Sequence, residues 1–311
     1  MQLPDDKRKI SVVICSYNRA DYIIQAIESL YFQTLSKEQF EVLVVDNNST
    51  DNTGELVKEY MLLHNDFQLF YLTEPRQGAS YARNTGADHA KAELLCFMDD
   101  DAIAEKHYLE RIVAFFASHP SATGLGGRII PKYIPAEPEW MSHYVSSMVG
   151  NFDYSKEACE FKPGKYPLES NMVVRKSDFL AIGGFNTALP GVKGTLRIGG
   201  EGKDFFFRLI ALNKKIYYDP AIIVHHVVEV KKLTPAYLYR VASGYGRGEK
   251  VRTKAISEWA YVKKIIEYCY KLAGSVAIGL FYAFQGKPAK TWPVIQFRID
   301  ALKGLLEKQA D

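Results

Sequence analysis

The sequence predicts an α/β protein with a mainly parallel sheet flanked by helices, followed by a helical C-terminal extension. Between residues 10 and 128, short apolar runs alternate with segments that carry apolar residues at helical spacing, which is the pattern of βαβ units. Beyond Thr234 the pattern is helical throughout. The 311 residues are 47% hydrophobic and 24% charged, a balance typical of a globular protein with a large buried core.

The elements of the first half are expected in alternation. The expected strands are residues 10–15, 41–45, 68–72 and 94–98. The expected helices are residues 21–32, 53–64 and 80–90, and capping candidates at residues 48–51 precede the second. Such a series places the carboxyl ends of the strands at one edge of the sheet.

The second half is less regular. Residues 131–167 are rich in proline and aromatic side chains and predict a long loop region, and regular structure is expected again at residues 169–175. A glycine-rich stretch, residues 190–202, is a candidate lid before a helix at 204–212 and strands at 215–218 and 221–226. We expect one domain over residues 1–230, with halves 1–128 and 129–230, and a helical extension over 231–311.

The C-terminal extension combines basic and apolar segments. Its basic residues near the start are opposed in sequence only by Glu249, and they are Lys231, Lys232, Arg240, Arg247, Lys250, Arg252 and Lys254. Anionic lipid could use such a surface. The apolar run at residues 272–284 is too short to span a bilayer but long enough to lie on one, and packing against protein is the alternative. The net charge of +3 is too small to indicate nucleic acid.

Polar and acidic clusters follow three of the predicted strands. They are residues 16–19, residues 46–51 and the three consecutive aspartates Asp99, Asp100 and Asp101. Ligands of parallel α/β sheets bind outside the carboxyl ends of the strands. Adjacent carboxylates repel each other unless a cation lies between them, and Mg²⁺ or Mn²⁺ bridged to a nucleotide diphosphate is such a cation. A solvated helix N-terminus is the alternative for the aspartates.

The first loop excludes two common nucleotide-binding classes. A dinucleotide-binding fold needs Gly-x-Gly-x-x-Gly after its first strand, whereas this chain has Cys15-Ser16-Tyr17-Asn18-Arg19. A Gly-x-x-x-x-Gly-Lys loop is also absent from the sequence. A dehydrogenase or a P-loop phosphotransferase is therefore disfavoured.

Four blocks in order resemble the inverting family 2 glycosyltransferases, whose fold is called GT-A. They are residues 12–19, 44–51, 78–84 and 99–101. The resemblance implies a nucleotide-sugar site formed by Ser16, Tyr17, Asn18, Arg19, Asp46, Arg83, Asp99 and Asp100. In the family the aspartate matching Asp46 recognises the nucleobase and the arginine matching Arg83 lies by the nucleoside. The first acid of the DXD motif, here Asp99, approaches the ribose, and the last, here Asp101, binds the metal. We expect Asp101 and Asp99 as metal ligands.

The resemblance continues to about residue 226 and places the acceptor side and the base. Residues 169–175 and 183–185 resemble the family's acceptor strand and its continuation. An adjacent Glu-Asp pair is usual where this chain has Glu201 and Gly202, so the aspartate that normally serves as base is missing. Glu201 and Asp204 are the candidates for the base, and Glu201 is favoured because it keeps the acidic position. The resemblance implies a further metal ligand from a downstream histidine. Alternation along a strand lets only one of His225 and His226 reach the metal, and we expect it to be His225.

These observations predict a cytoplasmic glycosyltransferase, peripheral on the inner face of the cell membrane if the C-terminal helices bind lipid. It would use Mn²⁺ or Mg²⁺ to transfer a sugar with inversion from a nucleotide diphosphate donor, of which UDP is the expected one. The acceptor would be a saccharide or a lipid-linked saccharide in cell-surface polysaccharide biosynthesis, and nucleic acid is not an expected partner. Two alternatives are a catalytically silent nucleotide-sugar-binding subunit of a polysaccharide assembly complex and a nucleotidyltransferase.

Overall fold

A computed structural model describes residues 7–193 and 196–307, so Gly194 and Thr195 of the candidate lid lie outside the described residues. The chain forms two compact units. The first contains residues up to Ile130, Phe152–Asn186 and Gly202–Val227. The second contains Pro131–Asn151, Thr187–Glu201 and the residues from Val228 onward. The last change from the first unit to the second falls between Val227 and Val228, after two earlier segments that also belong to the second unit.

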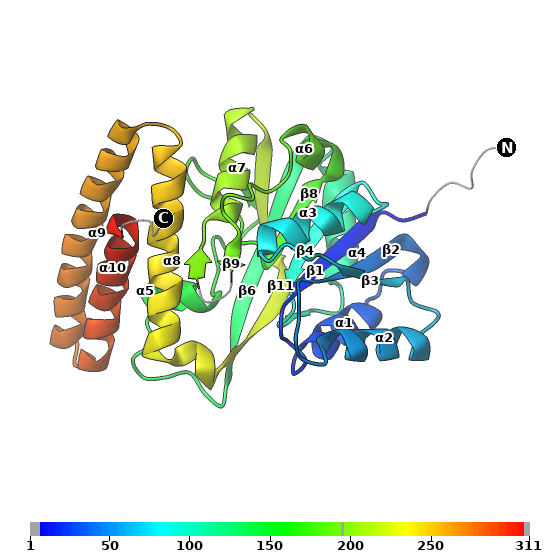
Figure 1. Cartoon of the computed structure of the whole chain (residues 1–311), viewed down its shortest axis with the longest axis horizontal. Helices are drawn as coiled ribbons and strands as arrows, with labels where there is room; N and C mark the ends of the chain where they lie inside the picture. Colours follow the sequence, from blue (N-terminus) through cyan, green and yellow to red (C-terminus); the bar gives the residue numbers. More distant parts are fainter. Residues whose placement is uncertain (1–6, 194–195, 308–311) are drawn as a thin grey trace. The chain divides into compact units, whose positions relative to one another are not determined.

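The first unit carries the α/β core (Figure 1). Its elements are β1 (Ile10–Ser16), α1 (Ile23–Tyr31), η1 (Lys37–Gln39), β2 (Phe40–Asp46), α2 (Thr53–Leu63), β3 (Leu69–Thr73), α3 (Ala79–His89), β4 (Leu94–Asp99), β5 (Ala102–Ala104), α4 (Tyr108–Ser118), β7 (Cys159–Glu160), β8 (Asn171–Arg175), α6 (Lys176–Ala181) and helix α7 (Glu201–Ala211) from its second residue onward. Strands β6 (Ala122–Ile134) and β11 (Lys215–Glu229) run from the first unit into the second. The strands and helices expected up to residue 98 are all present, with shifts of a few residues at their ends.

The strands form one mixed sheet in the order β3-β2-β1-β4-β8-β6-β11-β5, and β7 also pairs with β11. The ladders joining β1, β2, β3 and β4 are parallel, whereas β8 is antiparallel to both β4 and β6. The strands from the first half of the chain thus form the expected parallel part of the sheet. The strands from the second half extend the sheet with antiparallel pairs.

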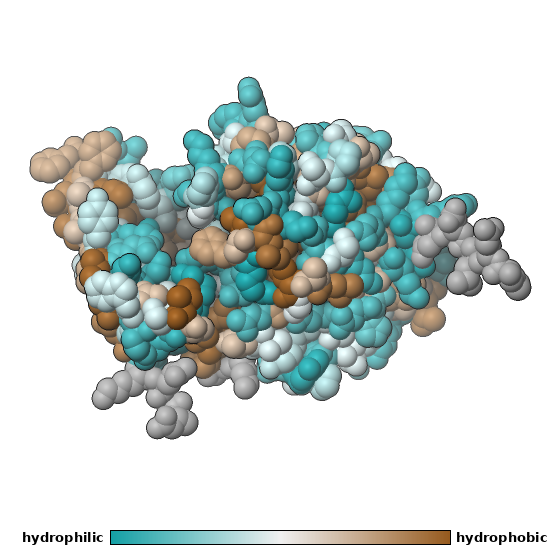
Figure 2. Space-filling view, turned by 90° about the horizontal axis from the view of Figure 1, so that it is seen from above, coloured by the Kyte–Doolittle hydropathy of each residue, from teal (hydrophilic) through white to brown (hydrophobic). Residues whose placement is uncertain are grey.

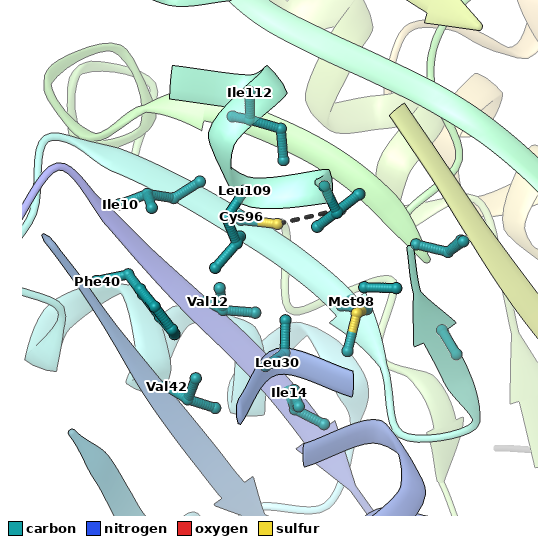
Figure 3. Packing of buried hydrophobic residues seen from close by; sticks show 14 of the residues in the cluster. Ile10, Val12, Ile14, Leu30, Phe40, Val42, Cys96, Met98, Leu109 and Ile112 are labelled. Atoms are coloured by element: carbon teal, nitrogen blue, oxygen red, sulfur yellow. Dashed lines mark hydrogen bonds between the residues drawn. The ribbon is translucent and has the colours of Figure 1, made fainter. Parts of the chain in front are cut away.

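Helices cover both faces of the sheet because the apolar residues of each strand alternate in direction. On one face Ile10, Val12 and Ile14 pack against α1, α2 and α4, and Figure 3 shows these side chains beside Phe40 and Leu30. On the other face Val13, between them in β1, joins a cluster with residues of α3, α6 and α7. Both faces of the sheet are therefore covered, and a ligand would bind at the carboxyl ends of the strands.

The second unit is mainly helical. Its elements are α5 (His143–Ser146), η2 (Ser147–Val149), β9 (Gly191–Lys193), β10 (Leu196–Ile198), η3 (Val230–Leu233), α8 (Pro235–Lys254), α9 (Glu258–Phe284), η4 (Pro288–Lys290) and α10 (Thr291–Leu306). Helices α8 and α10 meet at their backbones, because a Cβ on Gly246 would overlap the Ala301 carbonyl and one on Gly304 would overlap Ser243. The expected C-terminal helical extension is thus present.

Regular structure also occurs where a loop was expected. Within residues 131–167 lie the end of β6, helix α5, the turn η2 and the short strand β7. The apolar residues Met141, Val145 and Met148 of this segment are buried in a cluster with α8. Their spacing is helical but spans only two turns, which is too short for periodicity to identify a helix.

Candidate active site

The carboxyl ends of β1, β2 and β4 meet at one edge of the sheet. The parallel registers set Ser16 opposite Asp46 and Cys15 opposite Asp99. The clusters at residues 16–19, 46–51 and 99–101 are therefore neighbours at the carboxyl ends of parallel strands. This edge is where ligands bind in parallel α/β folds.

The first two loops are joined by hydrogen bonds. The Asn18 backbone N donates to the Ser49 hydroxyl at 3.0 Å, and the Asn18 side-chain oxygen accepts from the Thr50 N at 2.7 Å. The Arg19 backbone N donates to Thr53 Oγ1 at 3.0 Å. Asn18 has a φ of 53°, in the left-handed region that asparagine tolerates better than most residues. These bonds fix the half-buried Tyr17 between Ser16 and Asn18 and give the two loops one conformation.

Asp46 is buried at the end of β2, and both of its carboxylate oxygens accept hydrogen bonds. The Tyr71 hydroxyl donates to Oδ2 at 2.6 Å, and the Ser49 backbone N donates to Oδ1 at 2.9 Å. Burial, and then the Asp46 carboxylate, raise the pKa of Tyr71, so the phenol stays protonated as the donor. A carboxylate has about four acceptor sites, so this one retains capacity for an N–H of a ligand.

Arg83 lies on α3 and is buried close to the aspartate cluster. Its Nη2 is 3.8 Å from Asp99 Oδ1, and its guanidinium lies over the ring of Phe185 with 5.3 Å between the charge centre and the ring centroid. The aromatic ring and the carboxylate hold the guanidinium in one place. The structure thus brings Arg83 and Asp99 together.

Two of the three aspartates and one histidine form a candidate metal centre. One ligand atom from each of Asp99, Asp101 and His226 lies within 4.8 Å of the other two. Asp99 ends β4, Asp100 and Asp101 form a turn, and Ala102 begins β5. The turn, rather than an extended strand, brings Asp99 and Asp101 together.

His226, and not the expected His225, is the histidine at this cluster. The register of β11 on β5 pairs His226 with Ala102, next to Asp101, and places His226 Nε2 2.9 Å from Asp101 Oδ1. His225 points to the opposite face, where its Nε2 is 3.4 Å from Glu105 Oε1. Because side chains alternate along a strand, only one of the two histidines can reach the metal. The register in which β11 pairs with β5 decides which one. His226 therefore replaces His225 as the candidate ligand.

Asp100 lies next to the cluster and is also buried. Burial, and then the charge of Asp101, raise the pKa of Asp100 to about 7. Arg19 acts in the opposite direction, with its Nε 3.5 Å from Asp100 Oδ1 and its Nη2 3.5 Å from Asp101 Oδ2. Two arginines, Arg19 and Arg83, thus face three carboxylates.

The residues present fit a divalent cation. Two carboxylates and an imidazole are ligands that Mn²⁺ accepts, and the carboxylates also suit Mg²⁺. Three carboxylates lie here against two arginines, and burial, followed by the charge of Asp101, raises the pKa of Asp100. A cation that also binds phosphate oxygens would supply the missing positive charge.

The two expected candidates for the base stand at the start of α7. Asp204 accepts a hydrogen bond from Arg208 Nε at 2.8 Å, and the same guanidinium donates to the carbonyls of Ile182 and Gly184 at 2.7 Å each. Asp204 therefore has a structural partner in the loop after α6. Glu201 is the first residue of α7 and is buried.

Another carboxylate stands at the same helix end, and residue spacing gave no signal for it. The Gly202 backbone N donates to Glu169 Oε1 at 2.7 Å. A Cβ on Gly202 would come closer than 3.0 Å to Oε1, Cδ and Cγ of Glu169. The Glu169 carboxylate therefore occupies the space that a side chain at residue 202 would take.

Comparisons with known proteins agree with this geometry. Residues 11–182, more than half of the chain, match the family described as Glycosyl transferase family 2. A glucosyl-dolichyl phosphate glucuronosyltransferase of Haloferax volcanii is 25% identical over 226 residues, which are 70% of this chain and 69% of the relative.

Solved structures show the same fold. A mannosyltransferase from Pyrobaculum calidifontis, in complex with GDP-Man and Mn²⁺, superposes with a TM-score of 0.65 at 19% identity, over 99% of this chain and 90% of that chain. Staphylococcus aureus TarS 1–349, in complex with UDP, gives a TM-score of 0.55 at 19% identity, over 93% of this chain and 90% of that chain. The fold is GT-A, that of the nucleotide-diphospho-sugar transferases. The chain belongs to glycosyl transferase family 2.

Proposed function

We propose that this chain transfers a sugar, with inversion at the anomeric carbon, from a nucleotide diphosphate donor to a lipid-linked or polysaccharide acceptor. The observation that carries the proposal is the cluster of Asp99, Asp101 and His226 at the sheet edge that also holds Asp46 and Arg83. The family shows the enzyme class. The Haloferax relative is named for the transfer of glucuronic acid to glucosyl-dolichyl phosphate, and this name supports a lipid-linked acceptor.

UDP is the proposed nucleotide of the donor. Asp46 is buried with its carboxylate oriented by Tyr71 and Ser49, which suits it to accept an N–H from a nucleobase. The TarS structure holds UDP, whereas the Pyrobaculum structure holds GDP-Man, so a comparison of the two nucleotides tests this choice directly. Ser16, Tyr17, Asn18, Arg19, Arg83, Asp99 and Asp100 complete the proposed donor site.

Asp99, Asp101 and His226 would hold Mn²⁺ or Mg²⁺. When bound, such an ion stabilises the negative charge of a departing diphosphate. Arg19 and Arg83 add fixed positive charge beside it, and Arg83 is kept in place by Phe185. Arg83, Asp100 and Asp101 are buried, and charges shielded from water interact more strongly with phosphate.

The reaction also needs a carboxylate that accepts the proton of the acceptor hydroxyl. Of the two acids expected from the sequence, Asp204 is paired with Arg208, while Glu201 is buried at the start of α7. The pairing makes Asp204 the weaker candidate, because its carboxylate is engaged by a guanidinium that also binds the carbonyls of Ile182 and Gly184. Glu201 remains as the candidate that the family resemblance supports.

We also propose that the second unit binds the membrane surface through one face of α9. Large exposed side chains recur on this helix with separations of 7, 4, 11 and 3, namely Trp259, Ile266, Tyr270, Phe281 and Phe284. At about 100° per residue these positions fall within about 60° of one another, so they form a single stripe, hereafter the α9 stripe. The buried residues of α9, which include Tyr268, Ser275 and Gly279, lie on the opposite face.

The hydropathy of α9 supports membrane binding. The basic residues of segment 231–254 support it less than the sequence alone indicates. Brown residues lie along the left edge of Figure 2, the side on which Figure 1 shows α9. Several basic residues of the segment 231–254 are paired within the second unit: Arg247 and Lys250 contact Glu307, and Arg252 contacts Glu249. In the described ranges, no helix is long and apolar enough to cross a membrane. An amphipathic helix on the surface is consistent with this.

The test of the donor site is a thermal melting screen followed by a transfer assay. We expect UDP and UDP-sugars, with Mn²⁺, to raise the melting temperature more than GDP and GDP-sugars, because only ligands of the folded state stabilise it. Transfer of a labelled sugar to a lipid-linked acceptor should require the metal. The conservative variant Asp101→Asn should lower it by at least about 100-fold. Nucleotide binding without any transfer, or release of pyrophosphate instead, would overturn the proposal.

A further inference from the structure

Gly202 stands where the family commonly carries an aspartate, and a different carboxylate fills the space beside it. The atoms nearest to a Cβ built on Gly202 are Oε1, Cδ and Cγ of Glu169, each too close for both side chains to be present. The Gly202 N–H donates to Oε1 at 2.7 Å. The missing acid and the additional acid thus coincide in space although they are 33 residues apart in sequence.

We propose that Glu169 is the proton acceptor of the transfer, supplied from the loop before β8 in place of an acid on α7. This inference rests on the proposed function, and it replaces Glu201 as the base. Glu169 is half-buried, so part of the residue is open to solvent and to a substrate. The Asp204 carboxylate is bound by the Arg208 guanidinium. Glycine at residue 202 is required by this arrangement, because any side chain there would displace the carboxylate.

The backbone holds Glu169 at the edge of the sheet that carries the aspartates. Strand β8 runs antiparallel to β4, with Met98 opposite Asn171 as the last pair, just before Asp99. Glu169 lies two residues before Asn171, and the aspartates follow Met98 directly. Glu169 and the aspartates therefore leave the same end of this strand pair.

Asn171 fixes the loop that carries Glu169. Its backbone N donates to the Leu168 carbonyl at 3.1 Å, which closes a turn around Glu169 and Ser170. Its side chain is buried, accepts from the Tyr108 hydroxyl at 2.9 Å and donates to the Arg128 carbonyl at 2.9 Å. With the turn anchored at one end and Oε1 bonded to Gly202 at the other, Glu169 has little freedom to leave the site.

The step balances as a single displacement. As the acceptor oxygen bonds to the anomeric carbon, its O–H bond breaks and the proton passes to a carboxylate oxygen of Glu169. The bond between the anomeric carbon and the phosphate oxygen breaks at the same time, and the nucleoside diphosphate leaves with the electron pair. Glu169 must therefore be ionised before the reaction, and its Oε1 accepts the hydrogen bond from the Gly202 N–H in that form.

The first test compares Glu169→Gln with Glu160→Gln, an exposed glutamate on β7. Glutamine keeps an oxygen that can accept the Gly202 N–H, so the fold and the UDP affinity should be retained within about threefold. Loss of a general base costs about 10²- to 10⁴-fold, so the kcat of Glu169→Gln should fall at least about 100-fold while Glu160→Gln stays near wild type. A Glu169→Gln variant that keeps more than a third of the wild-type rate overturns the inference.

Two further variants separate a base from a structural residue. Formate should restore part of the transfer lost in Glu169→Ala, because a small carboxylate can accept the proton from the vacated space. The double variant Glu169→Ala with Gly202→Asp moves the acid to α7, and we expect it to recover at least about tenfold over Glu169→Ala alone. If loss and formate rescue follow Glu201→Ala instead, Glu201 is the base. If the wild-type chain transfers nothing from any donor, the proposed function itself fails.

Discussion

The Nε2 atom of His226 lies 2.9 Å from Oδ1 of Asp101, and the two residues come from strands far apart in the sequence. The backbone supports the contact, since the Val227 N donates to the Asp101 carbonyl at 2.9 Å. Because β11 pairs with β5 in this register, the last acid of the aspartate cluster and one histidine are fixed beside each other before any ligand binds. A metal centre can therefore form without rearrangement of the sheet.

The first prediction compares the two adjacent histidines. His226→Ala removes a proposed ligand, so the Mn²⁺ concentration for half-maximal transfer should rise at least about tenfold, equivalent to about 1.4 kcal/mol. His225→Ala is the matched control, because His225 faces Glu105 on the opposite side of the strand. Electron paramagnetic resonance of free Mn²⁺ in the presence of UDP measures binding independently of turnover. Equal effects of the two substitutions would exclude His226 as a ligand.

The second prediction concerns the hydroxyl of Tyr71. Tyr71→Phe removes the donor to Asp46 Oδ2 and leaves a buried carboxylate oxygen without that bond, so we expect a loss of about 1 kcal/mol in stability. UDP affinity should fall about five- to tenfold, because the carboxylate is no longer oriented. Isothermal titration with UDP and urea unfolding measure the two effects.

Tyr31→Phe is the control for Tyr71→Phe. The Tyr31 hydroxyl contacts the exposed carboxylate of Asp66 at 3.4 Å, so its loss should leave both UDP affinity and stability nearly unchanged. If Tyr71→Phe binds UDP as tightly as the wild type, Asp46 does not depend on Tyr71 for its role and the proposed nucleobase contact loses its support.

The sequence identifies the loops of the site because strand ends are encoded locally. Apolar runs end at Ser16, Asp46 and Asp99, and parallel pairing then brings them together. The choice between His225 and His226 is not local, since it depends on how β11 pairs with β5. The sequence does not identify Glu169 as a site residue for the same reason. Only the folded chain shows that the Glu169 carboxylate lies against Gly202. The basic segment also needed the structure, because Glu307 lies more than 50 residues from the arginine that it pairs with.

The third prediction concerns Glu74, which orders the loop leading into α3. The Arg76 side chain donates to Glu74 from Nε at 2.9 Å and from Nη2 at 2.7 Å, and the Thr85 hydroxyl donates to Oε2 at 2.5 Å. The Arg76 guanidinium, working against burial and aided by Thr85, lowers the pKa of Glu74 from 4.5 to about 2. A carboxyl whose pKa is lowered by folding stabilises the fold above its unfolded pKa and loses this effect as the pH falls through its folded pKa.

Glu74→Gln should therefore destabilise the protein by about 2 kcal/mol at pH 7, a value reduced from the full pKa shift because Arg76 is largely exposed. The difference from wild type should stay constant above about pH 5 and shrink to less than half by about pH 3. Urea unfolding at several pH values measures it, and Glu59→Gln, on the exposed side of α2, is the control. A difference that does not change with pH would show that the carboxylate charge is not what stabilises the loop.

The fourth prediction concerns the α9 stripe. Replacing Trp259, Ile266 and Phe284 by serine removes three large exposed side chains from one helix face, so affinity for phosphatidylcholine vesicles should fall at least about tenfold. Replacing Leu62 and Leu63 of α2, which are 83% and 72% exposed, is the matched control and should leave vesicle binding unchanged. Because Arg247 and Arg252 are paired with glutamates, anionic lipid should strengthen binding only a few-fold.

Two results of the co-sedimentation assay would contradict this prediction. If the α2 control lowers vesicle binding as strongly as the α9 variant, vesicles bind exposed apolar residues without selection. Co-sedimentation governed by lipid charge alone would instead assign the contact to the basic segment.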